Sequence, residues 1–219
     1  VGAILHVLYA EPDKTLARVA SVLSNPCQSF AATLHQMMAT RHLPSGPHPV
    51  VAAAARELLN KSENERSGVL STAMSFLSLY RDPTVAQVTS VCDWRVDDLI
   101  RAGRSVSLYL VVPPSDLSRT TPLIRLVLNQ IGRRLTERLG GERAAGRRLL
   151  LMLDEFPALG RLDFFETSLA FMAGYGVRAF LIAQSLNQIV KAYGENNAIL
   201  DNCHVRIAFS TNDERTARR

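Results

Sequence analysis

Apolar residues recur at helical spacing through the first third of the chain. Amphipathic helices are predicted over residues 14–23, 28–40 and 50–60. Ser62 and Glu65 have the spacing of a capping box, which opens a further helix. The apolar positions of that helix share one face: Val69, Leu70, Ala73, Met74, Leu77 and Tyr80. Asp82-Pro83 ends it, because a residue before proline avoids helical backbone angles. No convincing strand precedes this point, so residues 1–82 are predicted to form an all-α domain.

The pattern changes after Pro83, where apolar, β-branched runs begin to alternate with helical segments. Four runs are predicted as strands: residues 106–112, 149–153, 178–183 and 205–209. Helices are predicted between these strands. The first has apolar residues from Ile124 to Leu135 on one face, and the second covers residues 164–172. The third begins at a cap formed by Ser185 and Gln188, and Thr211 begins a last helix. This alternation predicts an α/β domain over residues 83–219, with a parallel sheet and right-handed crossovers. The run 149–153 is wholly apolar, so burial on both sheet faces is expected.

Composition narrows the class of protein. Hydrophobic residues make up 47% and charged residues 21% of the chain, as in soluble globular proteins. No apolar run is long enough to cross a bilayer, and no signal peptide is visible. The three cysteines are far apart and lack metal-ligand spacing, which fits a reducing cytoplasm. The chain starts at Val1 without Met and stops inside a predicted helix, so an internal fragment of a longer protein is expected.

The net charge is +5, and arginine makes up 22 of the 25 basic residues. Six arginines cluster in one stretch: Arg133, Arg134, Arg138, Arg143, Arg147 and Arg148. Such a cluster is either a solvated helix end or a patch that contacts nucleic-acid phosphates, and the pattern leaves both interpretations open.

Two adjacent carboxylates, Asp154 and Glu155, follow the apolar run 149–153 directly. Open α/β sheets bind their ligands at the carboxyl ends of the strands. In the Walker B arrangement of ATPases the Asp holds Mg²⁺, usually through water, and the Glu deprotonates the attacking water. The alternative is that the acids only cap the strand or the following helix.

Gln184 ends the next predicted strand and could contact a γ-phosphate or the attacking water. Taken alone, a glutamine here more often satisfies loop backbone groups. Two consecutive strands that each bring polar residues to one sheet edge favour a shared site.

A phosphate-binding Walker A loop is not found in the sequence. Residues 141–148 have similar glycine spacing, but Arg147 replaces the lysine and Arg148 replaces the hydroxyl residue that binds Mg²⁺. The segment also precedes a predicted strand, whereas the phosphate loop follows one. Residues 211–214 lack the lysine of a guanine-binding motif, and no Ser–His–Asp or Cys–His arrangement is suggested.

Several segments resemble the conjugal transfer TraG family, the coupling ATPases of type IV secretion systems. Residues 151–160, Leu-Met-Leu-Asp-Glu-Phe-Pro-Ala-Leu-Gly, closely resemble the family's Walker B segment. The similarity extends over residues 60–69, 109–116, 170–176, 182–184, 199–205 and 210–217.

The resemblance implies a RecA-like motor of the P-loop NTPase superfamily, with the all-α domain as an insertion. It implies ATP as substrate, Mg²⁺ as cofactor, and a homo-hexamer at the bacterial inner membrane, with this portion cytoplasmic. It assigns Mg²⁺ binding to Asp154, water activation to Glu155 and γ-phosphate sensing to Gln184. Some relatives place an arginine finger before the Gln184 strand; Ala173 occupies that register here, and Arg178 is the nearest basic residue.

The expected function is therefore that of a fragment of an ATP-driven pump. Its cargo would be single-stranded DNA with its attached relaxase, or an effector protein, delivered to the type IV secretion channel. Because the sequence contains no Walker A loop, the fragment alone is expected to be inactive as an ATPase. The alternative is a non-enzymatic module that docks a relaxosome or cargo beside an inert motor.

Overall fold

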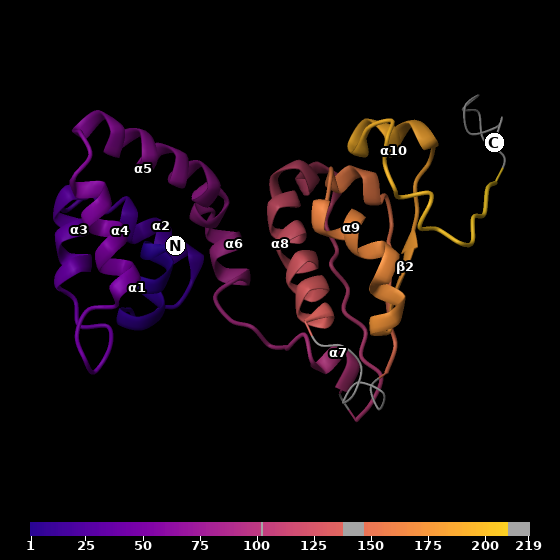
Figure 1. Ribbon diagram of the computed structural model, residues 1–219, viewed down its shortest axis with the longest axis horizontal. Coiled ribbons are helices and arrows are strands. Elements are labelled where there is room, and N and C mark those ends of the chain that lie inside the picture. Colours follow the sequence, from indigo (N-terminus) through magenta and orange to yellow (C-terminus); the bar gives the residue numbers. More distant parts are fainter. Residues whose placement is uncertain (102, 138–146, 210–219) are drawn as a thin grey trace. The chain divides into compact units, whose positions relative to one another are not determined.

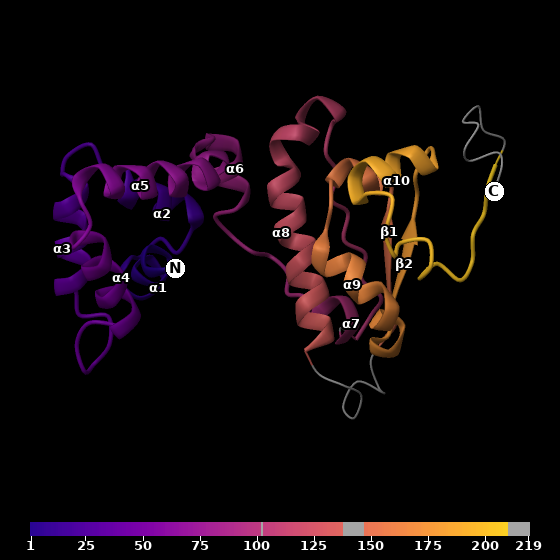
Figure 2. The same cartoon turned by 45° about the horizontal axis from the view of Figure 1, so that its top comes forward.

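A computed structural model describes residues 1–101, 103–137 and 147–209 of the chain. The chain divides into two compact units, Val1–Asp93 and Trp94–Arg219. Figures 1 and 2 show the elements of each unit from two directions.

The first unit is helical. Its elements are α1 (Gly2–Ala10), α2 (Leu16–Leu23), α3 (Phe30–Ala39), α4 (Pro49–Leu59), α5 (Glu63–Leu77), the short 3-10 helix η1 (Ser78–Arg81) and α6 (Pro83–Val88). Side-chain caps begin several of these helices, and Ser62 and Glu65 form the predicted capping box at the start of α5. The unit extends past residue 82 to Asp93, because α6 contacts η1.

Two neighbouring helices supply the centre of this unit. Leu34 and Met37 of α3 are buried against Val51 and Ala55 of α4. Helix α5 packs on α2, but no residue of α5 is fully buried, and Phe76 is 78% exposed. Of the apolar face predicted for this helix, Tyr80 lies in η1 and is buried, whereas Val69 is exposed.

The second unit combines helices with a small sheet. It contains α7 (Asp98–Arg101), η2 (Pro114–Asp116), α8 (Leu117–Thr136), β1 (Leu149–Leu153), η3 (Phe156–Leu159), α9 (Asp163–Met172), η4 (Ala173–Tyr175), β2 (Val177–Leu181) and α10 (Leu186–Tyr193). Strands β1 and β2 pair in parallel, from Leu149 opposite Val177 to Leu153 opposite Leu181. Helix α9 forms the crossover, so the described part of the unit is α/β.

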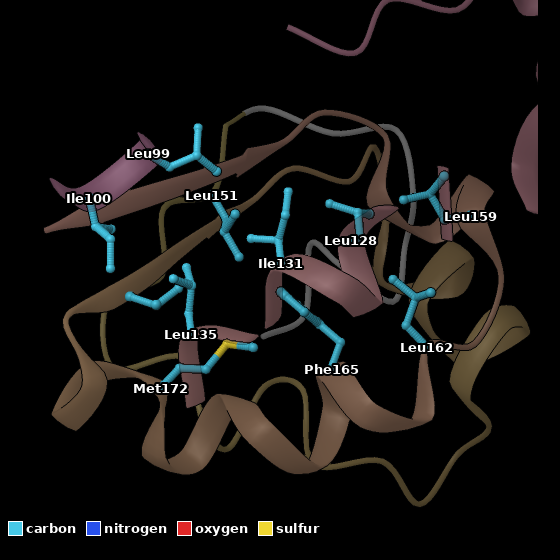
Figure 3. Packing of buried hydrophobic residues seen from close by; sticks show 11 residues of the cluster. Leu99, Ile100, Leu128, Ile131, Leu135, Leu151, Leu159, Leu162, Phe165 and Met172 are labelled. Carbon is cyan, nitrogen blue, oxygen red and sulfur yellow. The ribbon is translucent and has the colours of Figure 1, made fainter. Parts of the chain in front are cut away.

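The core of the second unit lies on one face of this sheet. Leu128, Ile131 and Leu135 of α8 point toward Leu151 of β1 and toward Phe165 and Met172 of α9 (Figure 3). Leu149 and Leu153 also pack against this cluster, because alternate residues of a strand face the same side. Residues from three elements thus exclude water from one face of the sheet.

The expectation that residues 149–153 are buried on both faces is wrong. Leu150 and Met152 are 55% and 62% exposed, and Phe180 beside Met152 is 45% exposed. Helices α8 and α9 contribute to the core on the opposite face, and within the described residues nothing buries this one. In the described part of the chain, this second face of the sheet is exposed.

Two predicted strands are absent from the described residues. Residues 106–112 and 205–209 have no regular structure, although both runs are mostly apolar. Val106 and Leu108 pack against the core, but Tyr109 is 81% exposed, and Ile207 is 69% exposed. A strand requires a neighbour that pairs with its backbone, and β1 and β2 pair only with each other in the part of the chain that is described. The helix predicted from Thr211 lies outside the described residues.

Among the described residues, no helix is both long enough and apolar enough to span a bilayer.

Candidate functional site

The carboxyl ends of β1 and β2 bring the three predicted site residues together. Backbone pairing continues past the strands, since the Ile182 amide donates to the Leu153 carbonyl at 3.0 Å. The Phe156 amide then donates to the Ile182 carbonyl at 3.1 Å. These two hydrogen bonds hold the turn that carries Asp154 and Glu155 beside the segment that leads to Gln184.

Glu155 has an unusual backbone conformation. Its φ of 50° and ψ of 39° lie in the left-handed region, and it is the only described non-glycine residue with positive φ. This conformation costs about 1 kcal/mol or more in a residue with a side chain. Strain of this kind collects at functional sites, where the surrounding structure enforces it.

The side chains of Glu155 and Gln184 are in direct contact. The Nε2 group of Gln184 donates a hydrogen bond to Oε1 of Glu155 at 2.7 Å. Asp154, next to Glu155, is exposed. The structure thus places an acceptor-only carboxylate, an amide and a solvent-accessible carboxylate at one edge of the sheet.

A second apolar cluster supports this edge. Phe156, Ile189, Tyr193 and Ile199 are buried together, and the rings of Phe156 and Tyr193 lie 5.8 Å apart. Burial raises the pKa of the Tyr193 hydroxyl. Because Phe156 directly follows Glu155, this cluster anchors the site to α10.

Arg125 fixes the segment that follows the site. From α8 it donates to the carbonyls of Leu159 and Arg161, at 3.1 and 2.7 Å. No local sequence pattern marks Arg125, because its partners lie more than thirty positions away.

The arrangement suits one kind of metal. Within the described residues no group of three His, Cys, Asp or Glu side chains could hold an ion by itself. Mg²⁺ does not need such a cage, because it keeps several waters and binds through one or two carboxylates plus substrate phosphates. The exposed carboxylate of Asp154 fits that mode.

Arg178 does not lie at this edge. It stands near the amino end of β2, opposite Leu150, whereas Asp154 and Gln184 follow the carboxyl ends of the strands. Ala173 begins η4, just before β2. Within one chain these residues are therefore separated from Asp154 and Gln184 by the length of the strand.

The arginine cluster is only partly described. The guanidinium of Arg133 lies over the Phe164 ring, 5.1 Å from its centroid. Arg134 pairs with Glu137 at 2.8 Å and with Asp97 at 3.6 Å, and these acids raise its pKa. Arg147 donates to the Gly103 carbonyl, and Arg148 is exposed. Arg138, Arg143 and the Gly-rich segment 141–146 lie outside the described residues.

The family of the chain follows from comparison with known proteins. The model of the family described as "Type IV secretory system Conjugative DNA transfer" matches residues 1–219. The chain belongs to this family. The resemblance read from the sequence is confirmed: the chain is a segment of a type IV coupling protein.

Named relatives agree. The Conjugal transfer protein TraG of Escherichia coli is 41% identical over 99% of the chain and 36% of its own length. Protein VirD4 of Rhizobium radiobacter is 36% identical over 64% of the chain and 20% of its own length. The Type IV secretion system-coupling protein VirD4 of Bartonella quintana is 24% identical over 89% of the chain and 30% of its own length. The chain thus spans about a third (36%) of the length of the TraG relative. No solved structure gives a significant match.

Proposed function

We propose that this chain is the Walker B part of the ATP-driven motor of a type IV coupling protein, with a RecA-like, P-loop NTPase fold. The observation that carries the proposal is the 2.7 Å hydrogen bond from Gln184 to Glu155, beside the exposed Asp154. Three polar side chains of the right types meet where parallel sheets bind ligands. Membership in the conjugative DNA transfer family supports the same reading.

Each side chain has a distinct role in this proposal. Asp154 would hold Mg²⁺, through water, and the bound ion would offset charge on the ATP phosphates. Glu155 accepts the proton of the attacking water. Before ATP binds, the amide of Gln184 orients the Glu155 carboxylate. When ATP is bound, Gln184 contacts the γ-phosphate or the attacking water. The phosphate-binding loop comes from another part of the full-length protein.

The cargo and partners follow from the family as proposals. The full-length protein would form a homo-hexamer at the bacterial inner membrane, with this portion in the cytoplasm. It would pass single-stranded DNA with its relaxase, or an effector protein, to the type IV secretion channel. Arg178, on the exposed side of β2, would serve as an arginine finger only toward a neighbouring subunit.

The test is Glu155→Gln in a full-length protein that carries this segment. The amide is nearly isosteric but cannot accept a proton, so kcat should fall by about 10²–10⁴-fold while ATP still binds. Glu57→Gln, on the exposed side of α4, is the matched control and should retain full turnover. Near-normal turnover by Glu155→Gln would exclude Glu155 as the base. No turnover by the unaltered full-length protein would favour the docking module with an inert motor.

The arginine cluster supports a second function, weak and sequence-tolerant binding of single-stranded DNA. Its expected contacts are Arg133, Arg134, Arg138, Arg143, Arg147 and Arg148. Asp97 and Glu137 already offset the charge of Arg134, and Arg133 is engaged with Phe164. Binding should therefore be modest and should weaken steeply with salt, because phosphate contacts release counterions.

Fluorescence anisotropy over a salt series tests this function. Changing the six arginines to Gln should weaken binding and flatten the salt dependence. The control removes equal charge elsewhere: Arg41, Arg56, Arg66, Arg81, Arg95 and Arg101 to Gln. Equal loss in both variants would show that net charge, and not the cluster, is responsible.

A further inference from the structure

Gln188 connects helix α10 to the site. Its Oε1 accepts a hydrogen bond from the backbone N–H of Gln184 at 2.9 Å. Its own backbone N–H reaches the hydroxyl of Ser185, the N-cap of α10, at 3.4 Å. In an ordinary capping box the side chain at this position returns to the amide of the capping residue itself. Here it bonds one residue earlier, to the peptide that carries Gln184.

The chemistry of the partners fixes how both amides are oriented. A backbone N–H only donates, so Gln188 must face Gln184 with its oxygen. An ionised carboxylate only accepts, so Gln184 must face Glu155 with its nitrogen. Gln184 is therefore the donor in both bonds, with its backbone N–H to Gln188 and with its side-chain amide to Glu155.

This chain of hydrogen bonds restrains a side chain that little else holds. Gln184 is exposed, whereas Gln188 is half-buried on a helix packed over Phe156 through Ile189 and Tyr193. A long exposed side chain loses rotamer freedom when it is held in one place. The bond from Gln188 fixes the backbone from which Gln184 reaches Glu155, and it thereby limits how far the amide can move.

We propose that Gln188 is a positioning residue for the proposed ATPase site: it holds Gln184 so that its amide orients the Glu155 carboxylate. This inference rests on the proposed function and adds a residue to it. In this role Gln188 acts through Gln184, whose backbone N–H it holds. Its role requires an acceptor atom, whereas the role of Gln184 requires a donor.

That difference between acceptor and donor defines the variants. In the full-length protein, Gln188→Leu removes the acceptor and should lower kcat about tenfold, with the KM for ATP changed by less than about twofold. Gln188→Glu keeps an acceptor at the same reach and should restore kcat to within about threefold. Gln184→Glu, the matched change, replaces the donor by a second carboxylate against Glu155 and should not be tolerated.

A double-mutant cycle separates positioning from capping. If Gln188 acts through Gln184, then Gln188→Leu should have no further effect on kcat in a Gln184→Ala background. Ser185→Ala removes the cap and leaves the Gln188 acceptor, so it should lower thermal stability more than kcat. Equal, additive loss in both backgrounds would show that Gln188 only stabilises α10 and would overturn the proposal.

A measurement on the chain itself is independent of turnover. Exchange of the Gln184 backbone amide, followed by NMR, should accelerate about tenfold or more in Gln188→Leu and stay near the original rate in Gln188→Glu. Unchanged exchange in Gln188→Leu would refute the positioning role even if the full-length protein hydrolyses ATP. Faster exchange in Gln188→Leu, in a protein whose turnover is insensitive to Glu155→Gln, would keep the contact and reject the proposed function.

Discussion

At the scale of single residues, the site combines local strain with a local hydrogen bond. Glu155 has a φ of 50°, which a glycine adopts freely and a residue with a Cβ does not. The paired backbone of residues 153–156 and 182 enforces this angle, and Gln184 then meets the carboxylate at 2.7 Å. The fold sacrifices stability at this position to present the side chain.

A comparison of two variants measures this strain. Glu155→Ala and Glu155→Gly both remove the carboxylate and its bond to Gln184, but only Ala retains the left-handed penalty. The Gly variant should therefore be the more stable by about 1 kcal/mol in chemical denaturation. At Ser71, an exposed position within α5, the order should reverse, with Gly less stable than Ala by about 1 kcal/mol. A less stable Gly variant at position 155 would show that the turn is not strained.

At the scale of elements, α8 and α9 are brought together by the absence of a side chain. A Cβ placed on Gly132 of α8 would lie 2.6 Å from Phe164 of α9. The same ring receives the guanidinium of Arg133. The close contact of the two helices therefore depends on glycine at this position.

Replacing Gly132 by Ala should destabilise the chain, although alanine has the higher helix propensity. Gly132→Ala gains about 1 kcal/mol of propensity, but overpacking against the ring costs about 1–3 kcal/mol, so net destabilisation is expected. Gly68 of α5 has no neighbouring atom within 4 Å of an added Cβ, so Gly68→Ala should stabilise the chain by about 0.5–1 kcal/mol. Thermal unfolding of both variants measures these two effects. Stabilisation by Gly132→Ala would mean that the Phe164 ring moves aside freely.

The first unit contains a buried pair of histidines that links α1 to the loop before α4. The His48 backbone N–H donates to Nδ1 of His42, which places the His42 proton on Nε2. That group donates to Nδ1 of His6 at 2.9 Å. The remaining proton of His6 then lies on Nε2, which faces Glu11 at 4.0 Å. Each ring is thereby held in one neutral tautomer.

Protonation should loosen this link. Burial, the neighbouring His42 and Arg18 lower the pKa of His6 against an opposing effect of Glu11. Burial and His48 lower the pKa of His42 against an opposing bond to Thr40. Since both pKa values lie below the ordinary 6.5, the unfolded chain binds more protons once the pH falls through that value. The stabilisation is complete above pH 6.5 and is lost as the pH falls toward the folded pKa values.

The measurement combines urea unfolding with an NMR titration of the imidazole C–H signals. The free energy of unfolding of the first unit should fall between pH 6.5 and the folded pKa values and then level off with respect to these two groups. His35→Gln, an exposed change in α3, should leave this dependence intact. Titration of His6 and His42 at or above 6.5 would contradict the assignment.

At the scale of the whole molecule, the chain consists of two separately packed units. The first has its core in α3 and α4, and the second around α8, α9 and the sheet. Residues 91–95 between them have no regular structure. Each unit therefore contains the residues that bury its own core.

Separate expression of residues 1–93 and 94–219 should preserve both folds. Their NMR spectra should overlay on that of the whole chain, except near the cut. A division after Asn60 serves as the control, because it separates α5 and η1 from α2, which they contact. The piece of residues 1–60 should then unfold less cooperatively, since Val19 and Ala20 lose part of their cover. Loss of structure in residues 1–93 would show that the units depend on each other.

The sequence by itself determined most of the helices, several of their caps, and the place of Asp154, Glu155 and Gln184 at one edge of the sheet. Ser62, Glu65 and Ser185 act as predicted because a cap involves atoms only a few residues apart. Asp154, Glu155 and Gln184 were predicted at one edge because parallel strands end on the same side of a sheet.

Only the tertiary structure decided the features that require distant partners. Residues 106–112 and 205–209 have the composition of strands, but in the described chain no neighbouring backbone pairs with them. The exposed face of β1, the strained angle of Glu155 and the bonds of Arg125 likewise arise from contacts between separate segments. Helix caps and hydrophobic periodicity depend on residues that are close in sequence. Strand pairing, side-chain burial and backbone strain depend on which segments come into contact in the folded chain.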